Sequence, residues 1–352
     1  MTEATGASHT DRFRFYLREI GQGPKAGRNL SRKEAREAME LILSQQASPA
    51  QMGGFLLLQR YKGESPEELA GFAEAIRASA RTIRPKVEGL LDVGSPYDGR
   101  KRSIVVSPAS TIVAAAAGVP VVMHGESVIG PKFGVPVGDV LDSLGVETHA
   151  EPEEVQRSVE DIGFGFMRQR HFVPQMYALK DLRAEIALRS CLSTLEKIYN
   201  LAGAQFSVIG LTHLPYFEKM MATAQLMGFQ RILIVQGIEG NEDAPTSRAC
   251  RVFEWAQGET REFKLDPGEY DLQAATKEEM AGGDADHNAS IAERILEGAP
   301  GGHRDLVCLN AGLRIYLTGR AGDIGEGIGR ARAVIDSGQA MAKLKALRER
   351  RR

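Results

Sequence analysis

A turn that carries a hydroxyl and a carboxylate follows a short apolar segment of the chain. The apolar segment, residues 90–93, is predicted to be a strand, and the turn at 94–99 holds Ser95 and Asp98 between two glycines. A helical pattern and a second apolar strand at 119–123 follow, and together these elements form a βαβ unit. Ligands of open α/β sheets bind at the turns after the strands. Residues 94–99 are therefore the first candidate ligand site, and a phosphate is the group to consider there.

Polar residues that could bind a sugar phosphate or a metal ion follow other predicted strands. His124 ends the second strand, and Lys132 lies in the loop after it. Glu242 and Asp243 follow a later apolar strand. Oxygen ligands suit Mg²⁺, which takes one or two carboxylates together with substrate phosphates. An acidic pair in a loop is also a common solvated turn, so this pattern alone leaves both interpretations open.

Two basic clusters also follow strand ends. Arg100, Lys101 and Arg102 come directly after the first turn, and Arg168 and Arg170 follow a later strand. If both strand ends face one cleft, these residues form a basic rim with aromatic side chains nearby, which is what single-stranded nucleic acid binds. Basic clusters are also ordinary solvated turns or sites for a substrate phosphate, and these alternatives stay open.

The composition is that of an ordinary globular chain, since 43% of its 352 residues are hydrophobic and 26% are charged. This length suits two domains. The net charge of −2 excludes a general polyanion binder, so any nucleic-acid site must be a local patch. Three scattered cysteines without CxxC spacing indicate a reducing compartment. The first ten residues lack the apolar stretch of a signal peptide, and we expect a cytoplasmic protein.

Residues 11–85 are predicted to form a small all-helical domain. Ser31, Ser48 and Ser65 are each followed three residues later by Glu or Gln, which is the capping-box pattern of a helix start. From about residue 88 onward, strands alternate with helices, and a further strand is predicted at 103–106. The predicted fold class is α/β, with the helical domain packed against a larger α/β domain and the ligand cleft between them.

Three motifs near the C-terminal end resemble those of the anthranilate phosphoribosyltransferase family. Residues 282–289 (GGDADHNA) are similar to the family's GGDAxENA loop, 310–311 to its NA helix start and 335–340 (IDSGQA) to its IDSGxA helix. The similarity extends over about 12–347. It implies a fold of the nucleoside phosphorylase/phosphoribosyltransferase type and a homodimer formed through the helical domain.

The resemblance also implies a domain partition and an activity. Helices at about 175–201 would join the helical domain, and 88–174 and 202–347 would form the α/β domain. Family members transfer ribose 5-phosphate from phosphoribosyl pyrophosphate to an amine and use Mg²⁺, which Glu242 and Asp243 would hold. The residues implied to bind substrate are Gly94, Ser95, Asp98, Ser107, His124, Lys132 and, for the acceptor carboxylate, Arg183.

The chain departs from the family at the motifs that bind substrate. The family's GTGGD reads GSPYD here, so Pro96 removes an amide donor and Tyr97 is expected to place a ring where bare backbone held the pyrophosphate. Glu126 stands where the family's KHGN motif has Asn, and its charge is expected to repel both anthranilate and phosphate. We therefore predict an acceptor other than anthranilate.

A function without catalysis is the alternative that these departures suggest. A sister branch with a similarly rewritten first loop and a Thr-Leu-x-Lys stretch, similar to residues 194–197 here, binds nucleic acid. The alternative is a nucleic-acid-binding protein that uses the same cleft and the basic rim. Its binding would weaken steeply with salt.

Overall fold

The computed structural model describes residues 9–23, 26–127 and 129–351. The prediction that the chain starts without a signal peptide falls mainly on residues outside these ranges. Within them, no helix is both long and apolar enough to cross a membrane. The three cysteines are buried free thiols.

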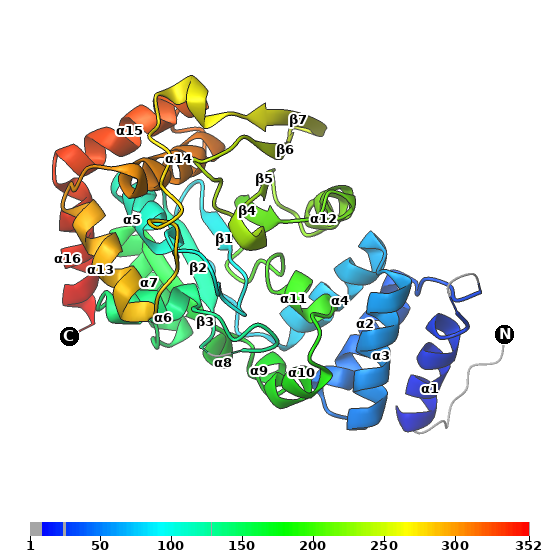
Figure 1. Ribbon diagram of the computed structural model, residues 1–352. Helices are drawn as coiled ribbons and strands as arrows, with labels where there is room; N and C mark the ends of the chain where they lie inside the picture. Colours follow the sequence, from blue (N-terminus) through cyan, green and yellow to red (C-terminus); the bar gives the residue numbers. More distant parts are fainter. Residues whose placement is uncertain (1–8, 24–25, 128, 352) are drawn as a thin grey trace.

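A bundle of helices forms the N-terminal part, at the blue end of Figure 1. Its helices are α1 (His9–Ile20), α2 (Arg32–Leu43), α3 (Pro49–Lys62) and α4 (Pro66–Ser79). The capping boxes predicted at Ser31, Ser48 and Ser65 are all present. Glu68, the N3 residue in the capping box of α4, also accepts a 2.7 Å hydrogen bond from Lys62 of α3. The predicted helical character of this part is confirmed.

A seven-stranded sheet occupies the centre of the remaining chain, in the order β3-β2-β1-β4-β5-β6-β7. Its strands are β1 (Leu91–Gly94), β2 (Val121–Gly125), β3 (Phe164–Arg168), β4 (Phe206–Leu211), β5 (Arg231–Gln236), β6 (Cys250–Ala256) and β7 (Glu259–Leu265). The first five run parallel, and β6 and β7 pair antiparallel. The strand order reverses between β1 and β4, and ligands of such sheets bind outside the carboxyl ends of the strands at this point.

Helices cover both faces of the sheet (Figure 1), so the chain has two apolar cores. Alternate residues of β2 show the division, since Val121 and Met123 belong to one core and Val122 to the other. The first core lies under α5 and the C-terminal helices, and the second joins the sheet to α12 and the helical bundle. The helices of this part are α5 (Ser107–Ala116), α6 (Val137–Ser143), α7 (Pro152–Ile162), α8 (Gln169–Phe172), α9 (Pro174–Tyr177), α12 (Pro215–Leu226), α13 (Ala285–Leu296), α14 (Gly302–Leu317), α15 (Ile324–Asp336) and α16 (Gln339–Arg350), with short 3-10 turns η1 (Ile238–Gly240) and η2 (Pro267–Tyr270).

The strand predicted at 103–106 is not formed. Ser103 makes only an isolated bridge, and the Val105 N–H donates to the side chain of Asn288 at 2.7 Å. Among the described residues this apolar segment has no neighbouring strand to pair with, so a side chain and a loop take up its backbone groups instead. It leads into α5.

Two short helices, α10 (Lys180–Ile186) and α11 (Cys191–Leu195), leave the α/β part and pack against α3 and α4 (Figure 1). α10 contributes the buried Arg183 to this region. The division of the chain into domains at the boundaries given above stays a prediction.

Candidate active-site cleft

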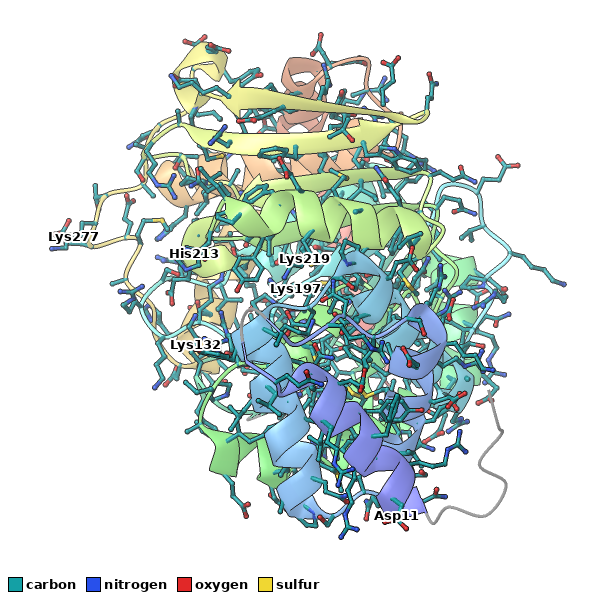
Figure 2. The ribbon with its side chains drawn as sticks, turned by 90° about the vertical axis from the view of Figure 1, so that its right-hand side faces the viewer. Asp11, Lys132, Lys197, His213, Lys219 and Lys277 are labelled. Carbon is teal, nitrogen blue, oxygen red and sulfur yellow. The ribbon has the colours of Figure 1, made fainter. Side chains whose placement is uncertain are left out.

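A cleft of about 550 Å³ lies between the helical bundle and the carboxyl edge of the sheet. Its walls come from the turns after β1 and β4, from the loop that holds Lys132 and from residues 187–197. Lys132, Arg189, Lys197 and His213 are among the cationic and titratable side chains that line it, and Figure 2 labels three of these residues. The cleft therefore lies where the turn at 94–99 was predicted to bind a ligand.

The glycines of the turn after β1 permit close backbone contacts. A Cβ on Gly94 would lie 2.8 Å from the carbonyl oxygen of Lys197, and one on Gly99, which has φ +68°, would lie 2.5 Å from the backbone of a neighbouring loop. Between these glycines, Asp98 accepts hydrogen bonds of 2.7 and 2.8 Å from Arg189. Asp98 thus lies at the cleft in an ion pair rather than as a free carboxylate.

The ring of Tyr97 packs beneath this turn and is only 2% exposed. Its hydroxyl forms hydrogen bonds with His124 Nδ1 at 3.0 Å and with the hydroxyl of Tyr199, and His124 Nε2 lies 2.7 Å from Asp92. Burial raises the pKa of Tyr97 well above its usual range, so the phenol stays neutral. The ring is therefore held inside the protein by these hydrogen bonds, while Tyr97 is still among the residues that line the cleft, and its effect on a bound phosphate stays a prediction. His124 is buried too, and each of its ring nitrogens has a protein partner.

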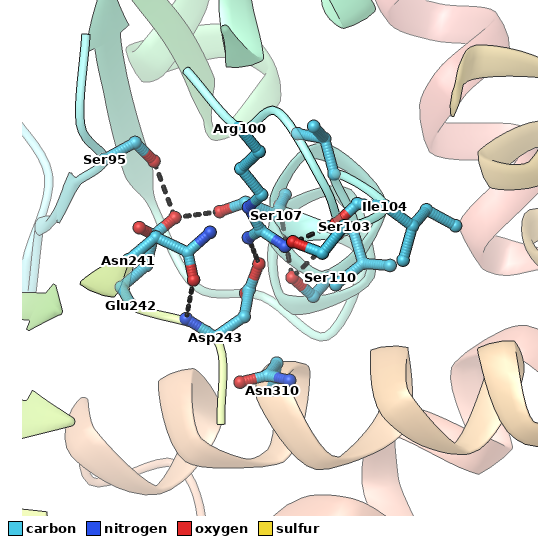
Figure 3. A network of polar contacts seen from close by, with 12 residues as sticks. Ser95, Arg100, Ser103, Ile104, Ser107, Ser110, Asn241, Glu242, Asp243 and Asn310 are labelled. Atoms are coloured by element: carbon cyan, nitrogen blue, oxygen red, sulfur yellow. Dashed lines mark hydrogen bonds and ion pairs between the residues drawn. The ribbon is translucent and has the colours of Figure 1, made fainter. Parts of the chain in front are cut away.

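Glu242 follows β5 and lies under the turn after β1 (Figure 3). Its Oε1 accepts hydrogen bonds from Ser95 at 2.6 Å and from Ser107. Burial by itself would raise the pKa of Glu242. The charges of Arg314 and Arg100 and the two hydroxyls have the larger, opposite effect, so the pKa lies below its usual value. Its second oxygen, Oε2, is buried without a hydrogen-bond partner in the described part of the chain. Glu242 is 1% exposed and is not among the residues that line the cleft.

Asp243 is paired with two arginines. Arg100, from the turn after β1, donates to one carboxylate oxygen, and Arg314, from α14, donates to the other at 3.2 Å. The Asn310 side chain accepts a hydrogen bond from the Ala244 N–H at 2.7 Å and donates one to the Ala244 carbonyl at 3.0 Å. All four charged side chains are at most 3% exposed, so two carboxylates and two guanidiniums form a neutral buried group. We call Arg100, Glu242, Asp243 and Arg314 the acid–arginine cluster.

These residues fit Mg²⁺ in a limited way. Mg²⁺ in proteins takes one or two carboxylates and completes its shell with waters and substrate phosphates. Glu242 Oε2 meets that requirement, whereas both oxygens of Asp243 already bind guanidinium groups. Among the described residues, no three His, Cys, Asp or Glu side chains gather as a metal cage. The donor set therefore suits an ion that brings its own phosphate ligands.

Glu126 is buried and its charge is matched. Arg170 donates from Nε to both carboxylate oxygens at 3.0 and 3.1 Å, and the Ser127 N–H adds a hydrogen bond of 2.9 Å. Burial raises the pKa of Glu126, but these donors outweigh it and the pKa is lowered. The expectation that Glu126 repels an anionic ligand is wrong, because its charge is neutralised and 0% exposed.

The predicted basic rim is not formed. Arg100 and Arg168 are 3% and 0% exposed and are ion-paired with aspartates. Arg170 is ion-paired with Glu126. Of the five residues, Lys101 and Arg102 are exposed. A buried carboxylate is costly without a partner, and three of these arginines serve as such partners instead of facing a ligand.

Arg183 is also engaged by a carboxylate of the chain itself. Its side chain is 4% exposed, and its guanidinium binds both oxygens of Glu196, one of them at 3.0 Å. Glu196 is 1% exposed and receives a further 3.0 Å hydrogen bond from Gln169. The residue implied to bind an acceptor carboxylate is therefore occupied in this structure.

Two cations of the cleft were missed by reasoning from sequence. Arg189 binds Asp98, as described above. The Nζ of Lys197 donates to the carbonyls of Gly210 at 2.7 Å and Gly240 at 3.0 Å. Burial, together with the charge of Arg189, lowers the pKa of Lys197 to about 8. The only signal for Lys197 was its place in the Thr-Leu-x-Lys stretch.

Glu239 was missed as well. It lies in η1 with φ 52° and accepts hydrogen bonds from the Ser103 N–H at 2.8 Å, from the Ser103 hydroxyl at 2.7 Å and from Lys132 at 3.2 Å. Burial raises its pKa, but these donors outweigh burial and lower the pKa to about 2. Glu239 thus holds Lys132 at the edge of the cleft.

Comparisons with known proteins cover nearly the whole chain. The family model described as "Glycosyl transferase family, a/b domain" matches residues 93–341, and the one described as "Glycosyl transferase family, helical bundle domain" matches residues 16–80. The anthranilate phosphoribosyltransferase of Acetivibrio thermocellus is 36% identical over 320 residues, which cover 90% of this chain and 92% of that protein. The enzyme of that name from Methanocorpusculum labreanum is 37% identical over 321 residues, which cover 91% and 93%.

Solved structures show the same fold. The anthranilate phosphoribosyltransferase of Thermus thermophilus has a TM-score of 0.84 and 31% identity, and the match covers 97% of this chain and 99% of that one. The Saccharomyces cerevisiae enzyme in complex with PRPP and Mg has a TM-score of 0.84 with 19% identity, and the match covers 97% and 99%.

Proposed function

Because this chain belongs to the glycosyl transferase family with an α/β domain and a helical bundle domain, we propose that it is a Mg²⁺-dependent phosphoribosyltransferase. Its donor would be phosphoribosyl pyrophosphate, and its acceptor would be a molecule other than anthranilate. The observation that carries the proposal is the cleft at the switch point of the sheet, which Lys132, Arg189 and Lys197 line together with the carboxylates of Glu64, Asp98 and Glu196. The lysines and the arginine offer donors to the phosphates of a sugar diphosphate, and the carboxylates offer acceptors to its hydroxyls.

The side chains of the cleft suggest how the donor is held. Lys132 supplies a point charge and Arg189 a planar fork, and both suit phosphate oxygens. Asp98 keeps the guanidinium of Arg189 oriented through two hydrogen bonds. When bound with the donor, Mg²⁺ would neutralise charge on the diphosphate leaving group, and Glu242 Oε2 is the oxygen that would reach it. The protein's own part is positioning and electrostatic stabilisation.

The state of Arg183 supports a different acceptor. An arginine fork recognises a carboxylate through two parallel hydrogen bonds, and Glu196 already takes that place. Anthranilate would have to displace a buried carboxylate to bind there. An acceptor without a carboxylate meets no such requirement.

Calorimetry with phosphoribosyl pyrophosphate and Mg²⁺ tests the donor site. We expect saturable heat with the wild-type protein, weaker binding with Lys132→Met and no change with the exposed control Lys101→Met. Pyrophosphate release with a panel of amines, anthranilate included, tests the acceptor. Absence of heat at millimolar donor would show that the transferase proposal is wrong, and efficient transfer to anthranilate would show that the acceptor proposal is wrong.

The same samples test the nucleic-acid alternative. A gel shift with a single-stranded oligonucleotide at several salt concentrations would support it only if binding weakens steeply with salt. Since Lys101 and Arg102 are the exposed residues of the predicted rim, their double alanine variant should abolish such binding.

A homodimer through the helical bundle also belongs to this proposal. Phe15, Leu57 and Tyr61 are 47%, 38% and 73% exposed on α1 and α3. Exposed apolar side chains grouped on adjacent helices are typical of an interface. Light scattering coupled to size-exclusion chromatography should give twice the mass of the chain, and a monomer mass would contradict the proposal.

A further inference from the structure

Glu64 differs from the other two carboxylates that line the cleft. Asp98 and Glu196 are bound by the guanidiniums described above, and the carboxylates of the acid–arginine cluster are not among the residues that line the cleft. Glu64 lines the cleft and is 8% exposed. Among the described residues, no hydrogen bond reaches its carboxylate, and its only ion pair is with Lys219, whose Nζ lies 3.6 Å from Oε2. Since hydrogen bonds from nitrogen are about 2.7–3.2 Å long, this carboxylate can still accept them from a ligand.

Two helix ends fix the position of Glu64. Gly63, which has φ 81°, ends α3, and Ser65 caps the start of α4. A glycine adopts a positive φ without the steric cost that a side chain adds. Glu64 is thus held between two ordered turns at the wall of the cleft, so little further ordering is needed when a ligand binds it.

Lys219 neutralises Glu64 only in part. It projects from α12 toward the helical bundle (Figure 2), and its Nζ lies 5.0 Å from the ring centroid of Tyr216. One ammonium group is thus divided between a ring face and a carboxylate that it does not reach with a hydrogen bond. Because a buried carboxylate is costly without a close partner, the site favours a ligand that brings a donor of its own.

The wall of the cleft next to Glu64 is apolar. Tyr216 and Met220 line the cleft from α12, and because they lie four positions apart they share one face of that helix. Leu188 lines the cleft as well, and Leu188 and Tyr216 are 49% and 43% exposed. Apolar surface beside a carboxylate suits a flat apolar ligand with a few polar groups. The ring of Tyr216 adds a preference for a positive charge.

We propose that Glu64 and Tyr216 form a subsite for a planar aromatic ligand with a cationic or N–H-donating group, and that this ligand is the acceptor. The assignment to the acceptor rests on the function proposed above. In the transfer, an amine nitrogen of the ligand forms the bond to C1 of the ribose, pyrophosphate leaves with the electron pair of the broken C1–O bond, and the nitrogen releases one proton to water. Lys132, Arg189 and Lys197 remain for the phosphates of the donor, so the two ligands use opposite charges of one cleft.

Calorimetry with benzamidine, a flat aromatic cation, tests the subsite on the full chain. Wild-type protein should bind benzamidine saturably at millimolar concentrations. It should bind the neutral isostere benzamide at least about tenfold more weakly, because hydrogen bonds between charged groups are the stronger ones. Glu64→Gln should weaken the binding of benzamidine by a similar factor. Glu67→Gln, three positions away and exposed, is the matched control and should bind it as wild type does.

Two further variants examine the neighbours of Glu64. Lys219→Met removes the resident cation, so benzamidine should bind about threefold to tenfold more tightly. Tyr216→Leu keeps an apolar side chain but loses the aromatic face, and it should weaken binding about threefold. A role of Glu64 in folding alone would not give opposite effects of Glu64→Gln and Lys219→Met on one affinity.

The proposal is wrong if benzamidine gives no saturable heat with the wild-type protein, or if Glu64→Gln folds and binds it unchanged. It is also wrong if Glu64→Gln weakens the binding of phosphoribosyl pyrophosphate and leaves that of benzamidine intact, because Glu64 would then accept from the hydroxyls of the donor. Should Glu64→Gln not fold, the comparison of benzamidine with benzamide on the wild-type protein decides. Failure of the transferase function alone gives a different pattern, since phosphoribosyl pyrophosphate would give no heat while benzamidine would still bind and depend on Glu64.

Discussion

Replacement of Arg183 by Met distinguishes a structural arginine from an acceptor-binding one. Methionine keeps most of the apolar stem of the side chain and removes the guanidinium. Glu196 would then be a buried carboxylate without its main partner, since it is 1% exposed and would keep only the hydrogen bond from Gln169. The substitution should therefore lower the free energy of unfolding.

The size of the loss follows from the burial of the pair. Removal of one partner of a buried ion pair costs about 3–5 kcal/mol, because the other charge is left uncompensated. The remaining donor, Gln169, places the expected loss near the lower end of that range. A second variant, Arg183→Met/Glu196→Gln, removes both charges and should recover most of the loss, to within about 1–2 kcal/mol of wild type.

Urea denaturation provides the measurement. Far-UV circular dichroism follows the helices, and the fluorescence of Trp255, the only tryptophan, follows the sheet, so coincident transitions would justify a two-state treatment. A single variant within about 0.5 kcal/mol of wild type, or a double variant less stable than the single one, would refute this reasoning. A stable single variant that no longer bound anthranilate would assign Arg183 to the acceptor after all.

Two further outcomes concern the floor of the cleft. The pKa of Lys197 falls from 10.5 to about 8 on folding. Between these two pH values the unfolded chain therefore binds more protons than the folded one. The free energy of unfolding should rise with pH over this range, by up to about 3 kcal/mol. Lys197→Met should lack this rise in parallel urea titrations, and identical slopes for the two proteins would contradict the assignment. Gly210→Ala should prevent stable folding, because a Cβ there would lie 1.7 Å from the backbone of Asn241; a soluble variant with a wild-type unfolding midpoint would contradict the packing of the loop after β5 against β4.

Local patterns were read correctly where neighbours in sequence decide the structure. The capping boxes at Ser31, Ser48 and Ser65 formed because each cap satisfies amides of its own first turn. The apolar segments around β1 and β2 became parallel strands. The exception, 103–106, had the composition of a strand but no strand beside it, and pairing depends on a partner that composition does not reveal.

The chemistry of the charged residues was harder to predict. Tyr97 and Glu126 were expected to obstruct the site, and both are buried with partners. Arg189, which lines the cleft, carried no motif that marked it, and Lys197 was marked only by the Thr-Leu-x-Lys stretch. A charged side chain takes its role from what surrounds it, and those neighbours come from other parts of the chain.

The sequence by itself determined the fold class, the helix starts, the family and the turn around which the cleft is built, because these depend on local spacing and on motifs. Only the tertiary structure decided which charges face a ligand and which neutralise one another. Arg100 and Asp243 are 143 positions apart and still form one ion pair. The cost of burying a charge forces such pairs to form, and burial is a property of the folded chain as a whole.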